Sequence, residues 1–176
     1  VGQHKNAIAL DLPGFGLSDK PPGTRYSFSY YEKIIEDFLH TLDITKIDIV
    51  VHDLGGPVGL MWALRHPEKV RRLALLNTLV YPEMSMMVKI FMISLRLPGL
   101  RHWISSPSGI RFSMKFGVTN KDQITDAVMK PYLEPFTSKE ARIGLLKGEK
   151  GLSIRGFREI AEKLPSFEGP VMCLYG

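Results

Sequence analysis

The sequence predicts an α/β fold: a parallel sheet flanked by helices, with an all-helical insertion before its last strand. Short apolar runs alternate with helical periodicity over residues 6–77, and one more apolar run ends the chain. This alternation is typical of parallel sheets, whose strands are joined by right-handed helical crossovers. The 176 residues are 44% apolar and 23% charged. This is the balance of a folded globular chain and excludes a disordered one.

The first predicted elements are a strand, a loop and an amphipathic helix. Asn6–Asp11 is a short apolar run, which is typical of a buried strand. Residues 12–23 are dense in proline and glycine and predict a loop. Apolar side chains then recur every three or four residues over Tyr31–Leu42, which predicts a helix. Ser29 and Glu32 have the spacing of a capping box at its start.

Two strands and a buried helix follow. Lys46–His52 and Val70–Asn77 are rich in aliphatic side chains and predict strands without a wet face. Leu54–His66, between them, is apolar nearly all round, which predicts a helix at the centre of the fold. Pro170–Tyr175 predicts a final strand. Residues 82–165 lack clean strand patterns and carry short helical ones, at Lys121–Lys130 and Ile154–Leu164 among others, and predict the all-helical insertion.

The charge is uneven along the chain. Residues 82–165 hold 14 Lys and Arg against 8 Asp and Glu, whereas the whole chain has a net charge of +5. The basic side chains of the insertion are scattered singly, so they predict a solvated surface and no nucleic-acid partner. No apolar run reaches the ~18 residues of a membrane helix, no charged leader opens the chain, and a single cysteine, Cys173, excludes a disulfide framework. We expect a cytoplasmic protein without membrane insertion.

The junction Val50–Gly59 is the stretch most informative about function. A strand runs directly into a helix here, with Asp53 at the turn and glycines at 55 and 56. Such a turn lifts one side chain above the edge of a sheet, and small neighbours let the crowded backbone close. Because the turn also begins a helix, free N–H groups and the helix dipole favour an anion there. The pattern predicts that the Asp53 carboxylate faces a cleft.

Two alternatives stay open at this turn. Asp is a preferred N-cap residue, so in the plainer interpretation Asp53 serves the helix alone. Glycines 55, 56 and 59 between a strand and a helix are also compatible with a dinucleotide-binding loop. Their spacing is not GxGxxG, however, and the next strand ends at Asn77 instead of an acid.

Three segments together resemble the α/β-hydrolase superfamily, namely DLPGFGLSDKPP at 11–22, VVHDLGGPVG at 50–59 and RHPEKVRRLALLNT at 65–78. Within it they are similar to the haloalkane dehalogenases and their relatives, which carry aspartate at the turn. The resemblance implies an α/β-hydrolase sheet that is incomplete at both ends of this chain. Residues 1–81 are then the first part of the core, 82–165 the helical cap and 166–176 the last core strand.

The resemblance implies that Asp53 is a nucleophile. An aspartate that attacks a saturated carbon displaces halide or opens an epoxide, and it keeps an alkyl ester on its own side chain until activated water hydrolyses the ester. The backbone N–H of Leu54 is expected to donate to the second carboxylate oxygen, as one half of an oxyanion hole. The expected substrate is a small apolar organic molecule, and neither a cofactor nor a metal is expected.

The chain departs from the family pattern in ways that bear on the substrate. Leu54 stands where many dehalogenases have a tryptophan that holds the halide, which leaves Trp103 as the candidate halide donor. Epoxide hydrolases use cap tyrosines, for which Tyr81 and Tyr132 are the candidates, and a related group decarboxylates β-lactones with the same turn. Haloalkane dehalogenase, epoxide hydrolase and β-lactone decarboxylase chemistry stay open, as does a non-catalytic binding or scaffold role.

No histidine of the chain has the context of a catalytic base. His52 precedes Asp53 and, by strand alternation, points away from the cleft, and a structural role is expected for His66 at a helix end. The resemblance places the base after Gly176, together with the acid that orients it, because Asn77 stands where some dehalogenases have that acid. We therefore expect this chain to be the middle of a longer enzyme and to be inactive by itself.

Overall fold

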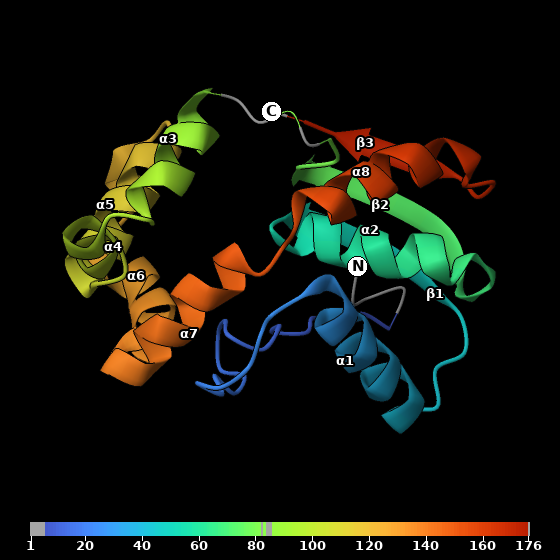
Figure 1. Ribbon diagram of the computed structural model, residues 1–176, viewed down its shortest axis with the longest axis horizontal. Helices are drawn as coiled ribbons and strands as arrows, with labels where there is room; N and C mark the ends of the chain where they lie inside the picture. The colour runs from blue at the N-terminus through green and yellow to red at the C-terminus, as the bar shows by residue number, and fades with distance from the viewer. Residues whose placement is uncertain (1–5, 82, 84–85, 176) are drawn as a thin grey trace.

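Three parallel strands form the centre of the computed structural model, which describes residues 6–81, 83 and 86–175. β1 (Ile47–Asp53), β2 (Val70–Thr78) and β3 (Val171–Leu174) lie side by side in that order. Both pairings are parallel, and helices cover the sheet and continue beyond its end (Figure 1). The predicted α/β architecture is confirmed, including these three strands.

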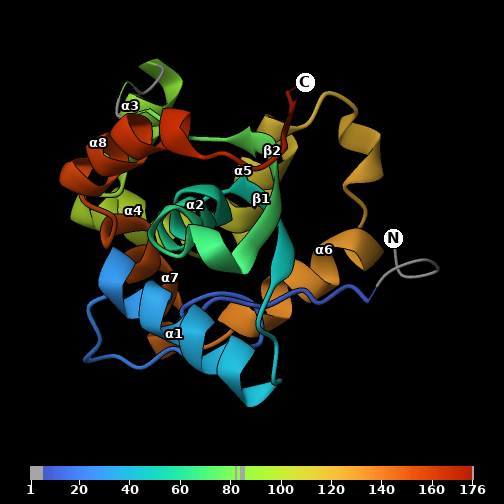
Figure 2. The same ribbon diagram turned by 90° about the vertical axis from the view of Figure 1, so that its right-hand side faces the viewer.

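Helix α2 (Gly55–Arg65) is the central buried helix that the sequence predicts. It lies on the sheet between α1 (Phe28–Thr41) and α8 (Ile154–Lys163) (Figure 2). Residues 56–63 of α2 are all buried, and Trp62 has no exposed surface. α2 contacts β1 and β2 as well as α1 and α8, and these contacts fix where its first turn meets the sheet.

One hydrophobic cluster joins the sheet to two of the helices. Leu73 and Leu75 of β2 pack with Leu60 and Met61 of α2 and with Ile160 of α8. Each of these side chains is 3% exposed or less. Full burial of an aliphatic side chain of this size stabilises a fold by about 1.5–3 kcal/mol, so this cluster holds α8 as firmly as α2.

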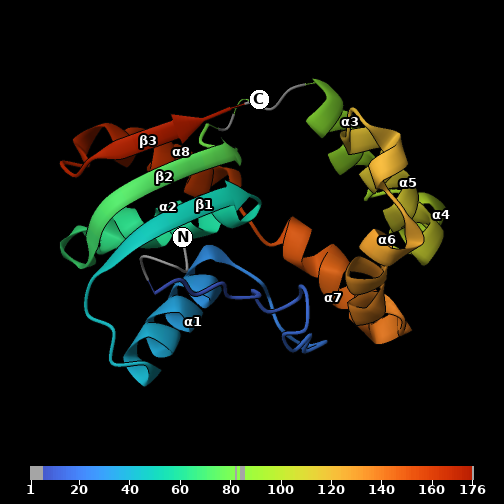
Figure 3. The same cartoon turned by 180° about the vertical axis from the view of Figure 1, so that it is seen from behind.

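The opposite face of the sheet carries no helix in the described part of the chain (Figure 3). Val50 pairs in register with Ala74, and Ala74 with Met172, so these three side chains share that face. Val50 is 64% exposed and Met172 is 52% exposed. The described helices therefore cover one face of the sheet only.

Ionic contacts join three helices at the end of α2. Arg65 forms ion pairs with Glu32 of α1 at 2.6 Å and with Glu159 of α8 at 2.7 Å. The guanidinium donates a hydrogen bond to each carboxylate oxygen of Glu159, and this lowers the pKa of Glu159 to about 2. A bidentate arginine–carboxylate pair is among the stronger ionic contacts, so Arg65 ties the two outer helices to the central one.

Beyond the carboxyl ends of the strands lies a group of five helices (Figure 3), which are α3 (Met86–Ser94), α4 (Pro98–Ile104), α5 (Pro107–Gly117), α6 (Asp126–Leu133) and α7 (Lys139–Lys150). The all-helical insertion is thus confirmed for the described residues. None of the helices described is long and apolar enough to cross a bilayer. The predicted boundary at residue 165 stays a prediction, and α8 is the part of that segment that packs on the core.

The end of α7 attaches the insertion to the core. Gly151 follows α7, and its backbone lies against the carbonyl oxygen of Tyr26, a residue that is only 1% exposed. A side-chain carbon on Gly151 would overlap that oxygen. In addition, Lys147 of α7 donates a hydrogen bond to the carbonyl of Pro22. The segment that precedes α1 therefore supports α7, the last of the five helices beyond the sheet.

Three local predictions are corrected. Asn6–Asp11 forms no strand, because no described strand runs beside it to share backbone hydrogen bonds. Ser27 caps α1 instead of Ser29, and its hydroxyl accepts a hydrogen bond from the first turn of the helix at 3.3 Å. Lys121–Lys130 is not one helix, because Thr125 caps a new helix, α6, within it.

The ion pair of Glu159 predicts an acid-sensitive contribution to stability. Because the pKa of Glu159 is lowered from 4.5 to about 2, its contribution is present above pH 4.5 and is lost as the pH falls toward 2. Glu159→Gln lowers the urea concentration at the midpoint of unfolding at neutral pH. As the pH falls from 4.5 toward 2, the midpoint of this variant decreases less than that of the wild type. Glu162→Gln, an exposed residue of the same helix, keeps the wild-type profile; equal profiles for all three proteins would contradict the prediction.

Gly151→Ala tests the attachment of α7. The added methyl group overlaps a backbone oxygen that cannot move away cheaply, so we expect a loss of about 1–3 kcal/mol in the free energy of unfolding. Gly117→Ala is the matched control, since Gly117 ends α5 and nothing lies within 4 Å of a side-chain carbon there. Urea unfolding of both variants measures the difference, and an equally mild effect at the two positions would refute the contact.

Candidate active site

Asp53 lies at a strained turn between β1 and α2. It is the last residue of β1 and has a φ of 44°, whereas Leu54, the next residue, already has the φ of −68° and ψ of −27° of a helix. A left-handed backbone at a residue other than glycine costs on the order of 1–3 kcal/mol and persists only where the surroundings impose it. The sharp strand-to-helix turn predicted from the sequence is therefore present.

The surroundings that impose the turn are Gly56 and Thr78. A side-chain carbon on Gly56 would overlap the hydroxyl group of Thr78, so only glycine lets α2 start this close to β2. The same hydroxyl donates a hydrogen bond to the Asp53 carbonyl oxygen at 2.8 Å. Thr78 is 7% exposed, and a buried carbonyl without such a partner would cost about 1–3 kcal/mol. Thr78 of the neighbouring strand thus stabilises the turn. This role was not predicted from the sequence.

The Asp53 side chain is exposed at the carboxyl edge of the sheet. No described side chain or N–H group hydrogen-bonds to its carboxylate, and Leu54, not Asp53, occupies the N-cap position of α2. The interpretation of Asp53 as a helix cap is therefore wrong. Asp53 directly precedes the first turn of α2, whose free N–H groups and helix dipole favour negative charge.

Asn77 is the next-to-last residue of β2, the strand beside Asp53. His52 pairs with Leu76 and Asp53 with Thr78, which puts Asn77 at the same edge of the sheet. Its φ of 35° is also left-handed, a conformation that asparagine tolerates better than most residues. Two neighbouring strands therefore have a strained polar residue at or next to their carboxyl end, a feature of sites that bind or transform ligands.

The structure does not bring Trp103 to Asp53. Trp103 lies on α4, which is in the part of the insertion farthest from the sheet (Figures 1 and 3). Its indole is 44% exposed and packs on Phe112 of α5, with 5.3 Å between ring centres. Its role as a halide donor stays a prediction.

The described histidines have surroundings that fit structural or solvent-exposed positions. His52 shares the helix-free face of the sheet with its register partner Leu76. His66 stacks on Trp62, with 5.6 Å between ring centres, and lies 3.3 Å from a carboxylate oxygen of Glu32. The others, His40 and His102, are exposed, and His4 lies outside the described residues.

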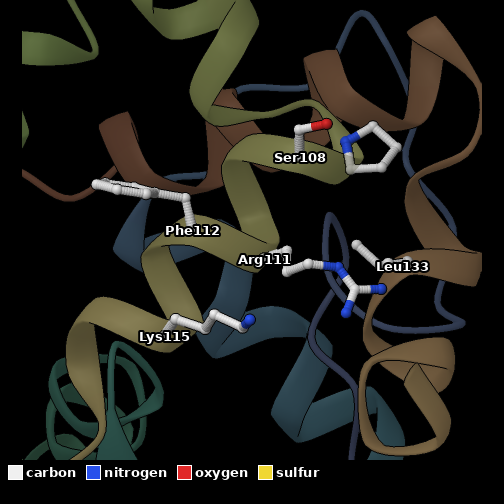
Figure 4. A pocket seen from close by; sticks show the side chains of 6 residues that line it. Ser108, Arg111, Phe112, Lys115 and Leu133 are labelled. Atoms are coloured by element: carbon white, nitrogen blue, oxygen red, sulfur yellow. The ribbon is translucent and has the colours of Figure 1, made fainter. Parts of the chain in front are cut away.

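Two open pockets can be described, and neither touches Asp53. One, of about 310 Å³, lies between α5 and α6 (Figure 4). The other, of about 530 Å³, lies between the loop at 13–21 and the α1 residues Tyr30 and Ile34. Among the residues that the structure describes, no three His, Cys, Asp or Glu side chains gather as a metal site.

Two relatives of this chain have the same enzyme name. The cis-3-alkyl-4-alkyloxetan-2-one decarboxylase of Shewanella oneidensis is 42% identical over 74 residues, which cover 40% of this chain and 23% of the relative. The enzyme of the same name from Xanthomonas campestris is 29% identical over 195 residues, covering 96% of this chain and 62% of the relative. The chain thus spans less than two thirds of the length of either relative.

A solved structure shows the fold of this chain, and a family model shows its family. The crystal structure of the haloalkane dehalogenase DbeA from Bradyrhizobium elkani superposes with a TM-score of 0.73 at 21% identity, covering 94% of this chain and 62% of that protein. Residues 3–100, more than half of the chain, match the model of the alpha/beta hydrolase fold family. With the strand–turn–helix geometry at Asp53, this match shows that the chain belongs to the alpha/beta hydrolase fold family.

Proposed function

We propose that this chain is the central part of an enzyme in which Asp53 attacks a carbon atom of a small apolar substrate and forms a covalent ester. The observation that carries the proposal is the exposed carboxylate at a left-handed turn, next to the first free N–H groups of a buried helix. A serine at this turn suits attack on acyl carbon. An aspartate suits displacement at saturated carbon, because the product is an ester instead of an anhydride.

The first substrate class is a haloalkane. One Asp53 oxygen bonds to the carbon as the halide leaves with the electrons of the carbon–halogen bond. Water, activated by a histidine outside this chain, then attacks the ester carbonyl and releases the alcohol and the free carboxylate. In this proposal the Leu54 N–H donates to the second carboxylate oxygen while charge builds there. The dehalogenase structure that shares the fold supports this class.

A second substrate class is a β-lactone, and two observations favour it. The decarboxylase from Xanthomonas campestris aligns with nearly the whole chain, and Leu54 has no side-chain donor for a halide. In this case Asp53 attacks the saturated ring carbon that is bonded to the ring oxygen. The C–O bond breaks, and the carboxylate that leaves stays tethered to the substrate. Loss of CO₂ then forms a C=C bond and expels the Asp53 carboxylate, so no water is consumed. Epoxides are less favoured, because the two candidate tyrosines, Tyr81 and Tyr132, are 59% and 52% exposed and face solvent.

We further propose the domain division of residues 1–81, 82–165 and 166–176, with the helical segment as a cap over the substrate. Its support is the position of α3 to α7 beyond the carboxyl ends of the strands (Figure 3). In open α/β sheets, ligands bind outside that edge. Within residues 82–165, Ile160 of α8 is buried with Leu60 of α2, so α3 to α7 form the cover of this cap and α8 joins it to the core.

Asp53→Asn in the full-length enzyme tests the nucleophile. The amide tolerates the left-handed backbone but cannot form the ester, so we expect turnover to fall by at least about a thousandfold with little change in thermal stability. Asp48→Asn is the control, since Asp48 lies on the same strand and pairs with Arg71 at the surface. Turnover that survives Asp53→Asn would end the proposal of Asp53 as the nucleophile, whereas a wild-type protein without any turnover would leave the scaffold role.

Leu54→Trp separates the two substrate classes. An indole N–H beside the leaving halide adds a hydrogen bond to a charged group, so kcat/KM for a bromoalkane rises by about tenfold or more, whereas a dialkyl β-lactone gains nothing. Leu54→Phe supplies similar bulk without the donor and is the control. If both variants behave alike toward the bromoalkane, residue 54 does not contact the leaving group.

A further inference from the structure

One long stretch of the insertion contains basic residues and no acidic ones. Between Glu83 and Asp122 the sequence has no Asp or Glu, and it has six cations, which are Lys89, Arg96, Arg101, Arg111, Lys115 and Lys121. The stretch includes α3, α4 and α5. A chain of this charge balance has about one acid for every ten residues, so the stretch forms a local region of positive potential.

The same stretch exposes large apolar side chains. Trp103 of α4 and Phe112 and Phe116 of α5 form a continuous row, with ring-centre distances of 5.3 Å and 6.3 Å. Their exposed fractions are 44%, 56% and 62%. On α3, Met86, Ile90 and Ile93 are more than half exposed as well. Contiguous exposed apolar groups of this kind mark interaction sites.

A pocket with cationic walls adjoins the aromatic row. Ser108, Arg111, Phe112 and Lys115 form one face of α5 at helical spacing, and they line the pocket of about 310 Å³ together with Pro107 and Leu133. Figure 4 shows Arg111 and Lys115 extending to the same side of the helix, toward Leu133, while the Phe112 ring points the other way. Phe112 therefore belongs both to the pocket and to the row.

The charge of this pocket is only partly neutralised. Arg111 forms an ion pair with Asp126 at 2.8 Å, and the Asp126 side chain is 94% exposed. Lys115 makes no hydrogen bond or ion pair with any residue that the structure describes. One cation of the pocket is thus available to an external anion, and a second is held only by a solvated carboxylate that an anion can replace.

We propose that the row of Trp103, Phe112 and Phe116, with Arg111 and Lys115 on the neighbouring side of α5 (Figure 4), docks on the surface of an anionic phospholipid bilayer. The aromatic rings enter the interface between headgroups and acyl chains, and the cations bind headgroup phosphates. The helices lie along the surface, since none of those described can cross a bilayer. α4 and α5 are at the end of the molecule farthest from the sheet (Figure 1).

The chemistry favours a lipid surface over other macromolecules. The breadth of the apolar surface favours a lipid surface, because exposed apolar side chains occur on α3, α4 and α5 alike, with cations among them. Nucleic acid would need cations in a cluster that tracks a backbone, and these are spread over three helices. The proposal does not depend on catalysis by Asp53, although apolar substrates concentrate in membranes and would be met there.

Vesicle binding by the chain tests the docking face, with one of its tryptophans as a built-in reporter. The probes are vesicles of phosphatidylcholine alone and of phosphatidylcholine with about one third phosphatidylglycerol. Of the two tryptophans, Trp62 is fully buried and Trp103 is 44% exposed. We expect co-sedimentation with the anionic vesicles only, and a blue shift and quenching by brominated lipid that Trp103→Phe abolishes. In about 1 M salt, where the Debye length is about 3 Å, binding weakens strongly.

Charge reversal provides the matched comparison. Arg111→Glu with Lys115→Glu lowers the partition coefficient by at least about tenfold, whereas Arg155→Glu with Lys163→Glu, the same charge change on α8 in the core, has little effect. Circular dichroism shows that each variant is folded. No binding, equal binding to both kinds of vesicle, or equal loss in both double variants overturns the proposal. Self-association in sedimentation velocity that buries Trp103 without lipid also overturns it and assigns the face to a second copy.

Discussion

The close approach of α2 to β2 is the constraint on which the site depends. α2 begins where Gly56 meets the Thr78 hydroxyl, and no side-chain carbon fits between them. The chain must therefore leave β1 and enter the helix within one residue, which drives Asp53 into a left-handed backbone. The hydrogen bond from Thr78 to the Asp53 carbonyl holds this conformation from the neighbouring strand. Strain at one residue is thus balanced by packing and hydrogen bonding next to it.

The rest of the fold keeps that contact in place. α2 is buried along most of its length and is held at its far end by Arg65, which reaches α1 and α8 through two carboxylates. The insertion leaves the sheet after β2 and returns through α7, whose end lies on the buried Tyr26. The helices beyond the strands are therefore connected to the core after β2 and again at the end of α7. This is the position in which the proposed cap would contribute to a substrate site.

Much of this could be predicted from the sequence, and the failures have physical causes. Periodicity identified α1, α2 and three strands, and the turn residues identified Asp53, because these signals are local. The run Asn6–Asp11 has the composition of a strand, but a strand also needs a neighbour to pair with, which composition does not report. Ser29 has the spacing of a cap, yet Ser27 takes that role since α1 starts earlier. Thr78 was missed because its contact with Gly56 joins residues far apart in the chain, and a lone threonine after a strand gives no local signal.

The covalent step proposed for Asp53 can be measured directly. The full-length enzyme is mixed with a slow substrate, quenched within the first turnover and digested, and the peptides are weighed. If Asp53 is the nucleophile, the peptide that contains it gains the mass of the alkyl group of a haloalkane, or of the whole β-lactone, as an ester forms. A substrate-derived mass on a different peptide, or product formation during which the Asp53 peptide stays unmodified at every time point, would contradict the central claim.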